Sequence, residues 1–278
     1  MKLSAGSWEA VVAPERAAIL SLMHAGRHVL RPTPPDAGEP FATGCFPLVP
    51  YANRIASGTF AWEGKIHHLP CNHPAQAHPL HGVGWLATWQ VTAAEGESVS
   101  MAMDYPGGAE WPWRFRAEQR ITLGDSGLTI ELAILNEDDA TMPVTLGFHP
   151  YFAKAPGDRL RFAARGMWLS NEEHLPTAHT AADHLGDWSG GGVLERPHLV
   201  DHCYTGWTGS AVIARATGDV FLEADDMRAL HLYVPPKEDF FCAEPVTAMP
   251  DAVNHGRAEI LAPGARRRVV MRIGLSRP

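Results

Sequence analysis

The feature that most constrains the fold is an alternation of apolar with small or polar residues, which has a period of two and recurs along the chain. It is clearest at Leu128, Ile130, Leu132 and Ile134. Successive side chains of a strand point to opposite faces of a sheet, so this alternation predicts strands that bury one face. The same pattern runs through residues 99–105 and 269–275, and long helical periodicity is absent.

Turn residues separate the apolar segments as an antiparallel fold requires. Gly124–Gly127 divides two apolar runs and Thr217–Asp219 divides two more, so both are expected to close hairpins. Residues 154–200 contain three consecutive glycines and several prolines, and there we expect an irregular excursion with short strands. A chain of 278 residues can form one large all-β unit. We therefore expect a single domain over residues 1–278, an antiparallel β-sandwich or barrel.

The charge of the chain argues against partners that need a basic surface. The formal net charge is −8, and the longest basic run is Arg266–Arg268. Nucleic-acid binding needs a basic stripe to neutralise phosphates, so no nucleic-acid partner is expected. We interpret the three arginines as a solvated strand edge. Apolar runs fall far short of the roughly 20 residues that a membrane span needs, and no membrane partner is expected.

The cysteines and the first residues indicate the compartment. Four cysteines are scattered at positions 45, 71, 203 and 242 without a C-x-x-C pair. This usage fits a reducing compartment better than a disulfide framework. Residues 1–9 lack the apolar core of a signal peptide. We expect a cytoplasmic protein, as a monomer or homodimer.

Fifteen histidines make a metal site the first chemistry to consider. They crowd residues 67–81 and recur at His174, His179 and His184. Neither set has the spacing of H-E-x-x-H or of another zinc motif. A five-residue spacing also places side chains on neither one helix face nor one strand face. We interpret these histidines as loop residues and expect neither a bound metal nor a cofactor.

Two polar segments offer hydrogen-bond donors of the kind that a polyol needs. Asn53 and Arg54 follow a strand-like run and present an amide beside a guanidinium. His81 stands beside Gly82 and Gly84, and glycine lets a backbone approach a ligand closely. Each segment is also open to interpretation as an ordinary turn.

Two further segments carry groups suited to proton transfer. His149 stands between Phe148 and Tyr151; burial lowers the proton affinity of a histidine, and a nearby carboxylate raises it. A satisfied core histidine is the alternative interpretation. Glu244 follows the apolar run Phe240–Ala243. A buried carboxylate is costly unless it is paired, and burial raises its pKa toward that of an effective general base.

Together these segments resemble motifs of the aldose 1-epimerase, or galactose mutarotase, family. Short motifs stand in the family's order: N-R-I at Asn53–Ile55, L-H-G at Leu80–Gly82, H-P-Y-F at His149–Phe152, D-H at Asp201–His202, and Glu244 followed by P-D-A-x-N at Pro250–Asn254. The resemblance implies a large antiparallel β-sandwich. It also implies a cofactor-free isomerase that interconverts the α and β anomers of a free aldose, a small-molecule monosaccharide.

The resemblance also implies a role for each residue. His149 is the general acid toward the sugar ring oxygen, and Glu244 is the general base on the anomeric hydroxyl. Sugar hydroxyls are held by Asn53, Arg54, His81 and Asp201. His231 stands where the family often has a substrate-binding glutamine, and this departure suggests an altered sugar preference. Trp85 and Phe148 are candidates for stacking on apolar sugar faces.

Three alternatives remain open. A mutarotase for hexose 6-phosphates needs basic residues in its site, and Arg31, Arg54, Arg114 and Arg116 are available. A sugar-binding protein without turnover could use the same fold, although binding alone does not require an acid–base pair. A metal-dependent lyase or isomerase would use the histidine-rich segments.

Overall fold

The computed structural model describes residues 1–275, which form strands β1 to β25 and two short 3₁₀ helices, Pro40–Ala42 and Ala56–Gly58. The strand ladders in this range are antiparallel. The expected all-β fold is confirmed. Among the same residues, no helix has the length and apolar character needed to cross a membrane.

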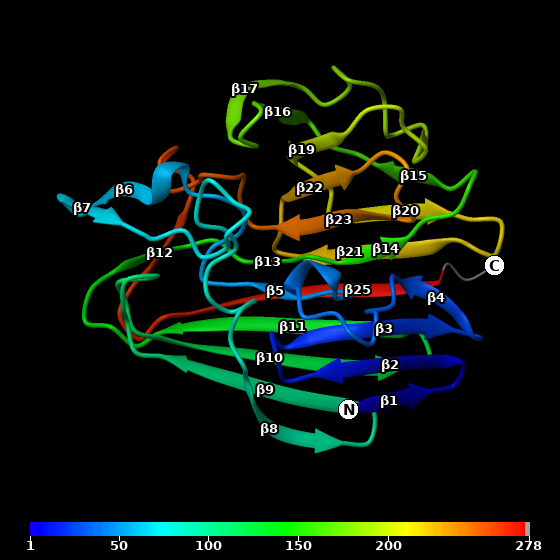
Figure 1. Ribbon diagram of the computed structural model, residues 1–278, viewed down its shortest axis with the longest axis horizontal. Coiled ribbons are helices and arrows are strands. Elements are labelled where there is room, and N and C mark those ends of the chain that lie inside the picture. The colour runs from blue at the N-terminus through cyan, green and yellow to red at the C-terminus, as the bar shows by residue number, and fades with distance from the viewer. Residues whose placement is uncertain (276–278) are drawn as a thin grey trace.

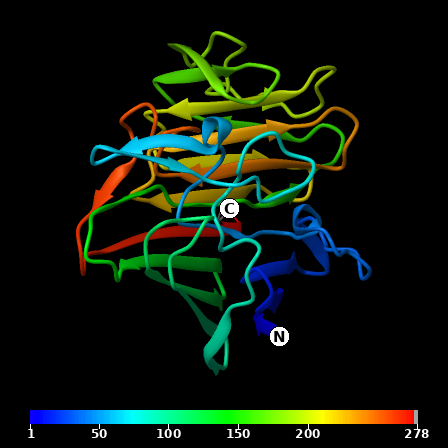
Figure 2. The same cartoon turned by 60° about the vertical axis from the view of Figure 1, so that its left-hand side comes forward.

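Two large sheets make up most of the molecule (Figures 1 and 2). The main path of the first sheet runs through β1 (Lys2–Ala5), β2 (Trp8–Ala13), β3 (Ala18–His24), β4 (Arg27–Leu30), β14 (Tyr151–Ala153), β23 (Phe240–Val246), β22 (Ala229–Val234), β19 (Val200–Thr205), β16 (Gly166–Ser170) and β17 (Pro176–Ala181). Two short strands, β13 (Gly147–Phe148) and β5 (Pro47–Leu48), join it through β23.

The second sheet runs in the order β18 (Gly192–Val193), β15 (Arg159–Phe162), β20 (Ser210–Ala214), β21 (Val220–Asp225), β25 (Arg266–Leu275), β11 (Gly127–Asn136), β10 (Phe115–Gly124), β9 (Ser98–Tyr105) and β8 (Gln90–Glu95). Two small ladders pair β6 (Thr59–Trp62) with β7 (Lys65–His68) and β12 (Met142–Val144) with β24 (Glu259–Leu261). β6, β7 and β12 lie together at the left of Figure 1.

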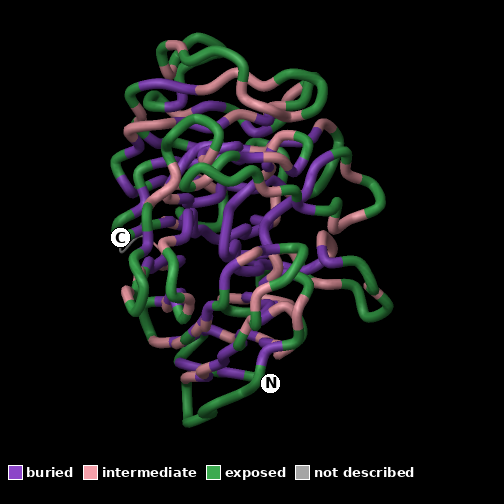
Figure 3. Tube along the Cα trace, turned by 90° about the vertical axis from the view of Figure 1, so that its left-hand side faces the viewer, coloured by how far each residue is buried: buried purple, intermediate pink, exposed green. Residues whose placement is uncertain are grey.

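One apolar core lies between the two large sheets. It includes Leu22 and Phe241 from the first sheet together with Ile121 and Leu132 from the second, and all four side chains are fully buried. Each such side chain contributes about 1.5–3 kcal/mol when it is removed from water. The buried segments gather along the middle of the molecule in Figure 3. The sheets therefore pack face to face, and the expected β-sandwich is confirmed.

The middle strands of the first sheet are covered on both faces. Along β23, Phe241 and Ala243 enter the sandwich core, whereas Cys242 joins a second and smaller cluster on the opposite face. Loop residues between 41 and 85 contribute to this second cluster. A strand that is buried on both faces reads as a continuous apolar run, as this segment does. The second face is the one that carries Glu244.

Both expected hairpins are confirmed: β10 and β11 pair up to Gly124 and Gly127, and β20 pairs with β21. The short strands β15 to β18 within residues 154–200 also agree with expectation. The interpretation of Arg266–Arg268 as a solvated strand edge agrees with the structure. These residues begin β25 and pair with β11, whereas the ladder between β25 and β21 starts only at Val270, so one side of this segment has no partner strand. Each of the three arginines forms an ion pair with a glutamate, at 2.5–2.7 Å.

The β10–β11 hairpin offers a matched test of this fold. Gly127 has a φ of 126°, and a Cβ at this position would lie 2.2 Å from the carbonyl oxygen of Ile273 on β25. Gly127→Ala should lower the free energy of unfolding by about 2–3 kcal/mol, since both the backbone and the neighbouring strand must shift. Gly124→Ala is the control, because a Cβ there meets no atom within 4 Å. Urea denaturation measures both, and equal stabilities would contradict the close approach of β25.

Candidate functional site

The register of β23 places His149 opposite Glu244. β13 pairs with the end of β23 through Gly147 and Val246, and β14 pairs with it through Tyr151 and Cys242. His149 and Glu244 lie midway between these pairings. Gly147 is needed for the approach, because a Cβ there would lie 2.7 Å from the carbonyl oxygen of Pro245. Paired residues project to the same side of a sheet, so the two functional groups meet.

His149 and Glu244 are in contact and almost fully buried. Nε2 of His149 lies 3.3 Å from Oε1 of Glu244. Burial raises the pKa of Glu244 to about 8 and lowers the pKa of His149 to about 3. The other ring nitrogen, Nδ1, and the other carboxyl oxygen, Oε2, have no hydrogen-bond partner among residues 1–275. Between these two pKa values, the pair therefore holds one exchangeable proton, on Glu244 in the ligand-free site.

A charged pair lies beside this acid–base pair. His231 stands opposite Glu244 on β22, and its Nε2 is 2.6 Å from Oδ1 of Asp201. Oδ2 of Asp201 is 2.5 Å from Nδ1 of His174. Burial opposes charge on His231, but the hydrogen bond to Asp201 raises its pKa well above the ordinary value. Burial also acts to raise the pKa of Asp201, but hydrogen bonds from the two histidines hold it below its usual range. The result is a carboxylate between two imidazoles.

Asn53, Arg54 and His81 come from two loops that are bonded to each other. The backbone N–H of Asn53 donates to Nδ1 of His81 at 3.1 Å, and the backbone N–H of His81 donates to the carbonyl of Asn53 at 2.9 Å. Gly82 follows with a φ of 72°, and a Cβ there would lie 2.3 Å from the carbonyl oxygen of Val49. Burial lowers the pKa of His81 well below its ordinary value. The neutral ring therefore carries its proton on Nε2, as a donor.

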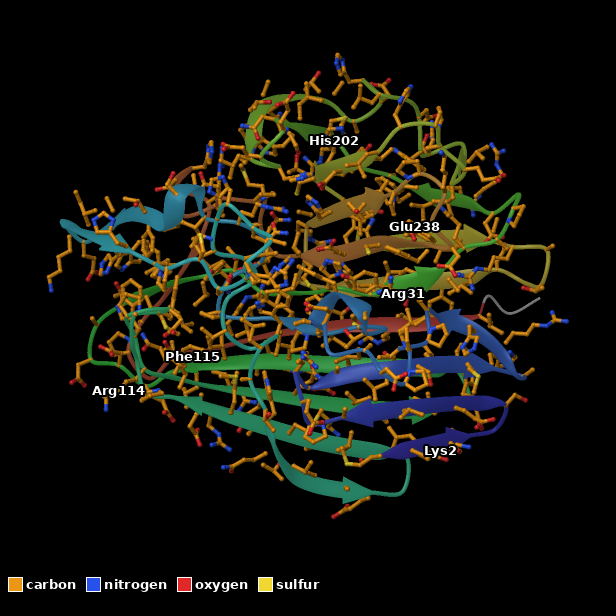
Figure 4. The ribbon with its side chains drawn as sticks, viewed as in Figure 1. Lys2, Arg31, Arg114, Phe115, His202 and Glu238 are labelled. Carbon is orange, nitrogen blue, oxygen red and sulfur yellow. The ribbon has the colours of Figure 1, made fainter. Side chains whose placement is uncertain are left out.

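These side chains share one cavity of about 470 Å³, a size usual for small-molecule sites. Its wall includes every residue that the sequence assigned to the site: Asn53, Arg54, His81, His149, Asp201, His231 and Glu244. Of the four arginines considered for a phosphate, Arg31 and Arg54 line the cavity. Arg114 and Arg116 lie outside it, and Figure 4 shows Arg114 far from Arg31.

The two aromatic residues expected to stack on a sugar do not line the cavity. Phe148 points into the sandwich core. The indole of Trp85 packs edge-on against His81 and donates to the carbonyls of Leu80 and Gly82. Both side chains are fully buried. The aromatic surface of the cavity comes instead from Phe41, Tyr151, Tyr233 and Phe240.

Sequence reasoning missed several residues of the wall. Tyr233 stands two residues after His231, and Phe240 stands four before Glu244, so the period of two could have identified both. His174 was grouped with loop histidines. It lies in the turn between β16 and β17, lines the cavity and contacts Asp201. No pattern in the sequence predicts the contact between His174 and Asp201.

The structure also tests the donor sets available for a metal. Within the described residues, one group could hold an ion: His149, Cys242 and Glu244, whose ligand atoms lie within 4.8 Å of one another. Burial raises the pKa of the Cys242 thiol and of the Glu244 carboxyl, which favours the protonated forms that bind metals poorly. The histidine-rich segments 67–81 and 174–184 provide no such group in residues 1–275.

Comparison with known proteins shows relatives that match the chain over almost its whole length. A family model described as aldose 1-epimerase matches residues 2–274. The uncharacterized protein YphB of Escherichia coli K12 is 31% identical over 280 residues, covering 94% of this chain and 93% of YphB. A crystal structure described as a "putative aldose 1-epimerase" from Escherichia coli K12 has a TM-score of 0.92 at 29% identity, over 99% of this chain and 98% of that one.

The fold is also that of a more distant structure. A galactose mutarotase-like protein from Clostridium acetobutylicum has a TM-score of 0.88 at 20% identity. The match covers 100% of this chain and 95% of the other. Identity at this level shows the shared sandwich alone.

The raised pKa of Glu244 has a consequence for stability. Between its ordinary value of 4.5 and about 8, the folded protein keeps a proton that the unfolded chain releases. The stability that this group contributes therefore falls as the pH rises through that window. Glutamine does not titrate, so Glu244→Gln should be more stable than the parent by an amount that grows from pH 5 to pH 8.5, on the order of a few kcal/mol.

Urea denaturation at several pH values measures this difference. Glu223→Gln is the control, because Glu223 is an exposed residue of β21. A stability difference between Glu244→Gln and the parent that does not vary with pH would show that Glu244 is not held protonated by burial.

Proposed function

The chain belongs to the aldose 1-epimerase family, and from that premise we propose that it interconverts the α and β anomers of an aldose by acid–base catalysis. His149 acts as the acid toward the ring oxygen, and Glu244 acts as the base on the C1 hydroxyl. The reaction opens the ring to the aldehyde, and reclosure on the other face gives the second anomer. The bond between C1 and the ring oxygen breaks and reforms while two protons are transferred, with no net change of oxidation state, so the chemistry requires no redox cofactor.

The observation that supports this proposal most directly is the 3.3 Å contact between His149 and Glu244. The ring oxygen and the anomeric hydroxyl oxygen are bonded to the same carbon, C1. A donor and an acceptor that act on these two oxygens must therefore both reach the region around C1, and two groups in contact meet that requirement. Nδ1 of His149 and Oε2 of Glu244 are buried without a hydrogen-bond partner among residues 1–275. Buried polar atoms are usually hydrogen-bonded, so these two atoms support the binding of a polar ligand at the pair.

The proton balance fits one turnover. Ring opening requires a proton on His149 and none on Glu244, and it leaves the reverse arrangement beside the open-chain sugar. That product arrangement is also the ligand-free one, because the pKa of Glu244 is raised and that of His149 is lowered. Reclosure on either face returns the proton to His149. The direct contact lets the proton pass between the two groups before a cyclic sugar reacts.

The remaining site residues would hold the sugar. Arg54 and Nε2 of His81 offer donors to hydroxyl groups, and Asn53 orients Arg54 through its amide oxygen, at 2.9 Å from the backbone nitrogen. Both oxygens of Asp201 already accept hydrogen bonds. We therefore assign Asp201 to holding His231 in its charged form, with His231 as the group that contacts substrate.

Replacement of either member of the pair tests the reaction. Glu244→Gln and His149→Gln should each lower kcat about 10²–10⁴-fold, the usual result of losing one acid or base. Optical rotation of freshly dissolved α-glucose and α-galactose, after chelator treatment, measures the approach to the anomeric equilibrium. Near-normal turnover by Glu244→Gln would overturn its assignment as the base.

The control for these variants is His68→Gln, on the exposed β6–β7 hairpin outside the cavity. Its rate should equal that of the parent. Sugar binding by calorimetry without any acceleration of mutarotation would instead establish a binding protein on this fold. Activity that is lost with the chelator and restored by a metal would favour the metal-dependent alternative.

The pH dependence follows from the single proton of the pair. Above about pH 8, Glu244 loses that proton and the pair has no acid to donate. Below about pH 3, His149 gains a second proton and the pair has no base. The catalytic efficiency kcat/KM should therefore fall on both sides of a plateau, and the alkaline limb should lie near pH 8. A rate that rises steadily through pH 9 would contradict this proton count.

A further inference from the structure

Two guanidinium groups line the cavity without a carboxylate partner. Arg31 and Arg54 stand in its wall, yet neither forms an ion pair with any acidic residue in the part of the chain that the structure describes. Arg54 donates to neutral acceptors instead, the amide oxygens of Asn53 and Gln76. Burial lowers the pKa of Arg54, so its charge is held there at a cost.

Arg31 is the cation that the acid–base mechanism does not use. It follows β4, and its backbone N–H donates to the carbonyl of Tyr151 at 2.7 Å. Its guanidinium carbon lies 4.2 Å from the ring centre of Tyr151 and 4.1 Å from that of Phe240. Nη2 donates to the carbonyls of Phe41 and Thr43, whereas Nε is buried without a partner among residues 1–275. The group is thus held rigidly, with donor capacity left over.

The acidic groups of the cavity do not balance these two arginines. The carboxylate of Asp201 already bonds two histidines, one of which is charged. The carboxyl of Glu244 is protonated below about pH 8. At neutral pH, the ligand-free wall therefore has a surplus of positive charge on Arg31 and Arg54. Inside a cavity, such a surplus attracts an anion more strongly than it would in open water.

We propose that the substrate is an aldose that carries an anionic group, a carboxylate or a phosphate, and that Arg31 binds this group. The inference rests on the proposed function. Tyr151 packs against Arg31 and also against His149, whose ring centre is 4.6 Å away. The ring of Tyr151 thus separates Arg31 from the acid–base pair. At this separation, an anionic group bound by Arg31 would be attached to a sugar carbon other than C1. A planar guanidinium matches both carboxylate and phosphate oxygens.

The test compares neutral and anionic aldoses on the full-length protein. Calorimetry gives Kd for D-glucose, D-glucuronate, D-galacturonate and D-glucose 6-phosphate, and exchange between anomers is followed by NMR. At least one anionic sugar should bind ten-fold or more tightly than D-glucose, and added salt should weaken its binding. Tighter binding of the uronates identifies a carboxylate as the natural group, and tighter binding of the phosphate ester identifies a phosphate.

Variants assign the effect to Arg31. Arg31→Met should weaken binding of the preferred anionic sugar about 10- to 100-fold, the usual loss for a charge-assisted hydrogen bond, and change binding of D-glucose less than about threefold. Arg31→Lys keeps the charge and should fall between Arg31→Met and the parent. Arg116→Met is the control, since Arg116 pairs with Asp104 outside the cavity. Circular dichroism confirms that each variant folds.

The possible failures can be told apart. Equal affinity for neutral and anionic sugars, or an equal loss of both in Arg31→Met, would overturn the anionic substrate whether or not the protein is a mutarotase. If anionic sugars bind through Arg31 but no aldose is turned over, the proposed function fails and the anion site stands.

Discussion

The site depends on the fact that β23 has a fixed neighbour on each side and a covered surface on each face. Its pairing with β13 and β14 sets Glu244 opposite His149, and its pairing with β22 sets Glu244 opposite His231. A slip of one residue would turn the carboxyl into the sandwich core and expose apolar side chains to the cavity. The packing of Phe241 and Ala243 in that core therefore holds the acid–base pair in place.

Part of the cavity wall is built from loops with strained backbone. Asn53, His81 and Asp251 each have a φ near 60°, which is unfavourable for residues with a side chain. Asp251 connects the loops: its backbone N–H donates to the carbonyl of Arg54, and its Oδ1 accepts from the backbone N–H of Ala56. The P-D-A-x-N segment thus holds the backbone of residues 54–56 through two hydrogen bonds of Asp251. Backbone strain of about 1–3 kcal/mol per residue persists only where surrounding hydrogen bonds hold the residue in that conformation.

The sequence predicted the fold class from local patterns, and it predicted part of the cavity wall from local patterns together with the family resemblance. Alternation reports which face of a strand is buried, and short motifs mark His149, Glu244 and His81 by their neighbours. Patterns of this kind carry no information on which distant loops meet. Hence the contact of His174 with Asp201 and the true position of Trp85 escaped prediction. Strand order likewise depends on long-range pairing, and no local pattern shows that β25 pairs with β21 on one side and with β11 on the other.

The position of β25 also bears on how the chain is made. This strand, residues 266–275, joins the two halves of the second sheet by pairing with β21 on one side and with β11 on the other. Among the described strands it is the last in chain order, so it is synthesised after β21 and β11. Until it emerges, the halves β18-β15-β20-β21 and β11-β10-β9-β8 each present an open edge where β25 will insert. Unpaired strand edges are general sites of aggregation, so completion of the second sheet depends on residues 266–275.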